Sequence, residues 1–130
     1  MFLLDTDTCI DVLRGVNTVV QRLRRLSPDD CSVSAISAFE LYAGVHLVRH
    51  PEREKRRVDD FLDVVTVVAF DRVTGQEAAR LRAELRGAGR PIGPYDLLIA
   101  AQAIRSNYIL VSANVREFSR IESLRLESWR

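Results

Sequence analysis

The chain has 130 residues, enough for one ordinary domain, and 47% of them are apolar while 28% are charged. The formal net charge is +1, so overall charge does not indicate a polyanionic partner. Cys9 and Cys31 have no paired spacing, which argues against a disulfide framework or a zinc site and favours a reduced, cytoplasmic setting. The N-terminal residues include Asp5 and Asp7 and no basic segment, so we expect no signal peptide. No apolar run approaches the ~20 residues of a membrane span.

Short apolar and β-branched runs predict strands at residues 2–4, 31–33, 66–70 and 108–111, with a fifth at 124–126. Between them, helical periodicity and capping residues predict helices at 7–14, 16–26, 34–48, 51–65, 71–87 and 95–106. Because strands alternate with helices, the sequence predicts an α/β fold with a central parallel sheet of four to five strands and helices on both faces. We expect one domain over residues 1–130.

Arginine accounts for all but one of the 19 basic residues, and it gathers around residues 22–25, 49–57 and 80–90. Its guanidinium group suits bidentate contacts with phosphate. A solvated helix face explains each cluster equally well, so both interpretations stay open.

One acid and one amide follow predicted strands, and two further acids lie in apolar helices. Ligands of parallel sheets bind beyond the carboxyl ends of the strands. Asp5 comes directly after the first strand, where a helix cap is the simpler interpretation and a site residue is the alternative. Glu40 shares a helical stripe with Ile36, Ala43 and Leu47, so its carboxylate needs a partner. That partner is either an arginine from another helix or a cation shared with other acids.

Asp96 lies in the first turn of a helix that begins with Pro94, where the helix dipole alone would favour an acid. The helix is apolar nearly all round, which indicates that it is buried with Asp96 at its inner end. Asn114 follows the strand ending at Val111 by three residues and offers an amide oxygen.

These ligands are all oxygens, which favours Mg²⁺ or Mn²⁺ over Zn²⁺, and such sites act on phosphates. His46 and His50 flank the basic run near residue 50 and are interpreted as surface residues.

Four segments in order resemble the motifs of PIN-domain ribonucleases, and the resemblance spans nearly the whole chain. They are MFLLDTDTCI at 1–10, VSAISAFELYAG at 33–44, GPYDLLIAAQA at 93–103 and LVSANVREFSRI at 110–121. Residues 126–130 also resemble the family's terminal strand and tryptophan. The closest similarity is to VapC toxins, notably the subgroup with GPYD and NxREF that cuts initiator tRNA.

The resemblance implies the toxin of a type II toxin–antitoxin pair, an endoribonuclease that needs Mg²⁺ or Mn²⁺ and cleaves RNA, with initiator tRNA favoured. It also implies a homodimer, silencing by a VapB-type antitoxin, and contact with DNA only through that antitoxin. Alternatives are a PIN nuclease acting on ribosomal RNA or DNA, and a non-catalytic PIN-fold binding or regulatory domain. A small-molecule phosphatase would want a nucleophilic aspartate and a phosphate-binding glycine loop, and neither is evident.

The motifs carry specific roles onto this chain. Asp5, Glu40 and Asp96 are the expected metal ligands, and Asn114 joins them as a catalytic residue that positions the attacking water. The expected supporting residues are Asp7, Thr6, Ser112 and Arg116, with arginines from 82 to 90 holding the RNA backbone. Two positions depart from relatives: Asp7 stands where many subgroup members have asparagine, and Asn114 where many PIN domains have aspartate.

Overall fold

A computed structural model describes all 130 residues and contains one five-stranded sheet. Its strands are β1 (Phe2–Leu4), β2 (Cys31–Ser34), β3 (Thr66–Val68), β4 (Ile109–Val111) and β5 (Leu126–Glu127). They lie in the order β3-β2-β1-β4-β5, and every neighbouring pair is parallel. The predicted parallel sheet is therefore confirmed, with β1 at its centre.

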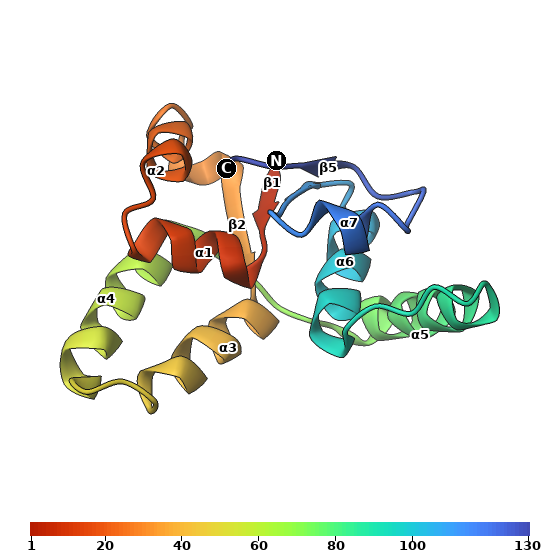
Figure 1. Cartoon of the computed structure of the whole chain (residues 1–130), viewed down its shortest axis with the longest axis horizontal. Coiled ribbons are helices and arrows are strands. Elements are labelled where there is room, and N and C mark those ends of the chain that lie inside the picture. The colour runs from red at the N-terminus through yellow and green to blue at the C-terminus, as the bar shows by residue number, and fades with distance from the viewer.

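Seven α-helices surround the sheet (Figure 1). They are α1 (Thr6–Leu13), α2 (Asn17–Arg24), α3 (Ala35–Val45), α4 (Pro51–Val64), α5 (Arg72–Gly87), α6 (Pro94–Ser106) and α7 (Val115–Phe118). A short 3₁₀ turn, Pro28–Asp30, leads into β2. No helix is long and apolar enough to cross a membrane.

The core has two parts, one on each face of the sheet, because successive strand residues point to opposite faces. Leu3 and Leu110 pack with buried residues of α5, α6 and α7. Leu4 and Val111, each the next residue along its strand, pack with buried residues of α1, α3 and α4. Helices thus cover both faces, as predicted, and the carboxyl ends of β1 and β4 meet between the two layers.

The prediction differed from the structure mainly where local signals are weak. Helix α7 was not predicted, since a four-residue helix has no apolar periodicity to read. The fifth strand was predicted at residues 124–126 and lies at Leu126–Glu127, where its two residues are defined by pairing with β4. Helix α3 ends at Val45 rather than near residue 48, and Leu47 beyond it is 87% exposed.

The C-terminal residues hold the helices that follow β1. Arg130 donates two hydrogen bonds to the buried carboxylate of Asp11 on α1, at 2.8 and 2.9 Å. Glu127 accepts from Arg22 on α2 and from the Trp129 indole, whose ring also packs edge-on against Phe2. Figure 1 shows the two ends of the chain side by side. The first and last residues of the chain therefore stabilise each other.

Candidate active site

Asp5 combines the two roles that the sequence left open for it. It is 3% exposed at the end of β1, and its carboxylate caps α1 by accepting a hydrogen bond from the Thr8 amide at 2.8 Å. Burial raises the pKa of Asp5, while hydrogen bonds from Ser112 and Thr8 oppose that rise. The cap fixes the carboxylate at the carboxyl edge of the sheet, between β1 and β4.

Glu40 has a hydroxyl as its partner, and not an arginine. The Thr6 hydroxyl donates to Glu40 Oε1 at 2.7 Å, and Ser37 Oγ lies 3.0 Å from the same hydroxyl. The predicted stripe on this helix was wrong, because α3 buries Ser37, Leu41 and Val45 and leaves Ala43 exposed. Glu40 is partly buried beside that face, where Thr6 directs it toward the start of α1.

Among the three expected metal ligands, Asp96 is the carboxylate whose negative charge has no hydrogen-bond or ion-pair partner. It stands in the first turn of α6, which buries six of its later residues, as the apolar sequence predicted. Burial, which has the largest effect, and four neighbouring carboxylates together raise the pKa of Asp96 to about 6. In decreasing order of effect these are Asp5, Glu117, Asp7 and Glu40. The five strongest influences on the pKa of Asp96 all raise it, and its carboxylate forms no hydrogen bond or ion pair with another residue of the protein.

Asn114 does lie at this edge, and it brings in an acid that the sequence reasoning missed. Its side-chain amide donates to Glu117 Oε2 at 2.9 Å, and Glu117 Oε1 accepts from the Gly93 amide at 2.7 Å. These two hydrogen bonds lower the pKa of Glu117, so it is ionised beside Asp96. The available signal was its position three residues after Asn114, which places both side chains on one side of a helical turn.

The expected supporting residues are arranged in different ways. Thr6 binds Glu40, and Ser112, which is fully buried, binds Asp5 and accepts from the Asn114 backbone amide at 2.9 Å. Asp7 is exposed but close enough for its charge to raise the pKa of Asp96. Arg116 is exposed on α7. Their roles in a reaction stay predictions.

His46 and His50 are exposed in the segment between α3 and α4. This agrees with their interpretation as surface residues.

The donor set fits a hard divalent cation that keeps part of its water shell. No three acidic, histidine or cysteine side chains converge closely enough to bind one ion by themselves. Mg²⁺, however, is usually held by one or two carboxylates together with waters. A Cβ placed on Gly93 would lie 3.8 Å from both Asp96 Oδ2 and Glu117 Oε1, so these two carboxylates flank one point. The uncompensated charge around Asp96 gives a cation a reason to bind there.

Comparison with known proteins identifies the family of this chain. The model of the PIN domain family matches residues 2–124. The tRNA(fMet)-specific endonuclease VapC of Shigella flexneri is 33% identical over 128 residues, which cover 98% of this chain and 97% of that protein. Ribonuclease VapC2 of Haemophilus influenzae is 36% identical over 129 residues, with the same coverage. The chain belongs to the VapC group of the PIN-domain family. The prediction that the chain resembles PIN-domain VapC proteins is thereby confirmed.

Solved structures place the VapC fold among toxin–antitoxin complexes. DNA-bound VapBC from Salmonella typhimurium matches with a TM-score of 0.94 and 33% identity, over 99% of this chain and 98% of that one. VapBC2 from Rickettsia felis, bound to a DNA fragment from its promoter, matches with a TM-score of 0.93 and 32% identity over the same shares. The α/β fold expected for a VapC protein is confirmed.

Proposed function

We propose that this VapC chain is the toxin of a type II toxin–antitoxin pair and cleaves RNA at the acidic edge of its sheet, with initiator tRNA as the preferred substrate. The family and the names of its relatives in Shigella flexneri and Salmonella typhimurium support the substrate. The observation that carries the site is Asp96, whose pKa is raised to about 6 by burial and by four other carboxylates. We include in the proposal one PIN domain over residues 1–130, a homodimer, and a cytoplasmic setting that suits two free cysteines.

The proposed cation ligands are Asp5, Glu40 and Asp96, acting directly or through water, and Glu117 joins them. When bound, Mg²⁺ or Mn²⁺ would neutralise charge on the phosphate and lower the pKa of the attacking water. Three of these acids are held by neighbours: Asp5 by the Thr8 amide, Glu40 by Thr6, and Glu117 by the Gly93 amide. Fixed carboxylates need little reorganisation when the substrate arrives.

The chain's own groups suit an in-line hydrolysis. In the proposed reaction a water, oriented by Asn114 and Asp7, attacks the scissile phosphorus while the bond to the 3′ oxygen breaks. The water passes its proton to solvent, while Asp96 stays among the proposed cation ligands. The departing 3′ oxygen takes a proton from solvent, which leaves a 5′-phosphate and a 3′-hydroxyl.

Cleavage of defined RNAs tests the proposal. Purified protein is incubated with initiator tRNA, elongator tRNA and ribosomal RNA in Mg²⁺, Mn²⁺ or EDTA, with Asp5→Ala as the inactive control. We expect metal-dependent cuts in initiator tRNA that carry 5′-phosphates and are absent with the control. Equal cleavage of all three RNAs would contradict the proposed preference for initiator tRNA. A lack of any cutting, together with no binding of Mn²⁺, would instead favour a non-catalytic binding domain.

The toxin role has a separate test in cells. Expression of the chain alone should arrest growth, and co-expression of its VapB-type antitoxin should restore it. The Asp5→Ala variant should not arrest growth at equal protein levels. Growth arrest by that variant would show that toxicity does not come from the acidic site.

A further inference from the structure

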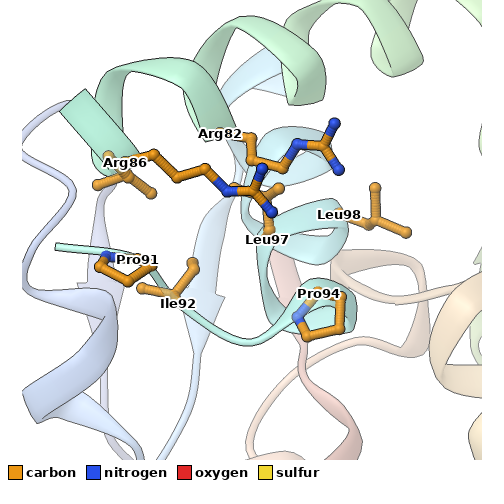
Figure 2. A pocket seen from close by; sticks show the side chains of 8 residues that line it. Arg82, Arg86, Pro91, Ile92, Pro94, Leu97 and Leu98 are labelled. Carbon is orange, nitrogen blue, oxygen red and sulfur yellow. The ribbon is translucent and has the colours of Figure 1, made fainter. Parts of the chain in front are cut away.

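A hollow of about 340 Å³ lies between α5 and the segment that leads into α6 (Figure 2). Its lining consists of two arginines, three leucines, one isoleucine and two prolines: Arg82, Arg86, Leu85, Leu97, Leu98, Ile92, Pro91 and Pro94. The volume is within the roughly 300–1,000 Å³ range of pockets that take small molecules. The hollow is therefore large enough for a ligand with one flat apolar part.

The charge of this hollow has one sign. Arg82 and Arg86 lie one turn apart on α5, and Figure 2 shows both side chains over the Pro91–Pro94 segment. Neither arginine forms an ion pair or a hydrogen bond with the protein, and no acid lines the hollow. Arg80 on the same helix differs, because Glu77 and Glu84 both bind its guanidinium group. The two lining arginines are thus free to bind an anion.

The hollow shares its lower wall with the acidic site. Ile92, Pro94 and Leu97 line the hollow, while Gly93 and Asp96, which alternate with them in sequence, belong to the acid cluster. A polyanion bound at the acids reaches Arg82 and Arg86 by continuing across the segment of residues 92–97, which borders both features. An unpaired nucleotide offers both a phosphate for arginine and a flat base for apolar side chains and guanidinium planes.

We propose that this hollow receives one unstacked nucleotide of the RNA next to the scissile phosphate. Arg82 and Arg86 bind its phosphate, and Ile92, Leu97 and the two prolines contact its base. The inference rests on the proposed ribonuclease function and adds a nucleotide subsite to it.

Binding of a single-stranded RNA tests the subsite without cleavage. Fluorescence anisotropy in EDTA compares the unaltered chain with Arg82→Gln, Arg86→Gln and the matched control Arg80→Gln, after thermal melts have shown that each variant folds. We expect each pocket variant to weaken binding about tenfold. The slope of log Kd against log salt should fall by about 0.7 for each lost phosphate contact on a single strand. The control should change neither quantity.

The proposed contact between the hollow and a base is tested with a series of RNAs, each of which carries one abasic ribose at a different position. One position should weaken binding to the unaltered chain, and the double variant Arg82→Gln/Arg86→Gln should lose that difference. If the pocket variants bind RNA like Arg80→Gln, the subsite is wrong, and a weakened affinity for the antitoxin or for a second copy would then identify the real occupant. Failure of the chain to cut any RNA would count against the proposed function, while the anisotropy result still decides the subsite.

Discussion

At the scale of single residues, the acidic edge of the sheet brings together carboxylates that repel one another. Asp96 is half-buried among Asp5, Glu117, Asp7 and Glu40, and its own carboxylate has no hydrogen-bond or ion-pair partner in the protein. A buried charge without a partner lowers the stability of a fold. Residues kept in such an arrangement are good candidates for function, because replacing them should stabilise the protein.

The first prediction concerns Asp96→Asn in EDTA. Because the pKa of Asp96 is raised from 3.8 to about 6, the folded state binds more protons than the unfolded state between those values. The contribution of Asp96 to the free energy of unfolding therefore falls as the pH rises from 3.8 to about 6, and little of it remains at higher pH. The variant should melt roughly 3 °C higher than the unaltered chain at pH 7.5 and equally at pH 4.

Thermal melts followed by circular dichroism provide the measurement, and the same preparation should have lost RNA cleavage. A variant that cleaves RNA at the original rate, or that melts lower at pH 7.5, would contradict this reading of Asp96.

Glu117 gives a second prediction. Its carboxylate orients Asn114 and binds the loop before α6, so Glu117→Gln should reduce the single-turnover cleavage rate by roughly 10–100-fold, as loss of a group that binds a metal through water does. The measurement is single-turnover cleavage of tRNA, with the exposed Glu122→Gln as the matched control. An unchanged single-turnover rate in the Glu117 variant would remove this residue from the site.

At the scale of elements, local signals predicted most of the fold. Ser34 and Asp71 cap α3 and α5, and Asn107 ends α6 in the left-handed region with a φ of 57°, as short polar residues do at helix ends. Glu117 was missed because the hydrogen bond that brings it to the site joins α7 to Gly93, a residue 24 positions earlier. The buried side of α3 was also predicted wrongly. It is determined by packing against α1 and α4, which the sequence of α3 alone does not reveal.

The third prediction concerns the anchoring of α1 by the last residue. Arg130→Met leaves the carboxylate of Asp11, whose side chain is 4% exposed, without its two hydrogen bonds. We expect the melting temperature to fall by roughly 4 °C. Calorimetry checks this against Arg24→Met, which removes an exposed arginine from α2. If both variants melt alike, the C-terminal contact does not stabilise α1.

At the scale of the whole molecule, the proposed cation site would couple cation binding to folding. A ligand that binds only the folded state stabilises it in proportion to the logarithm of its concentration. Adding Mg²⁺ or Mn²⁺ should therefore raise the melting temperature of the unaltered chain at pH 7.5 by several degrees at concentrations well above Kd. The same ions should have little effect on Asp96→Asn, which has lost the central carboxylate. An equal shift for both proteins would place the cation elsewhere.

The position of β1 in the sheet also bears on how the protein is made. This first strand pairs with β2 on one side and with β4, more than one hundred residues later, on the other. The acids come from residues 5, 40, 96 and 117, so a nascent chain cannot assemble the site until nearly all of its sequence has been translated. A ribosome that synthesises this ribonuclease would thus be exposed to its activity only after the protein is almost finished, which leaves time for a co-translated inhibitor to be present.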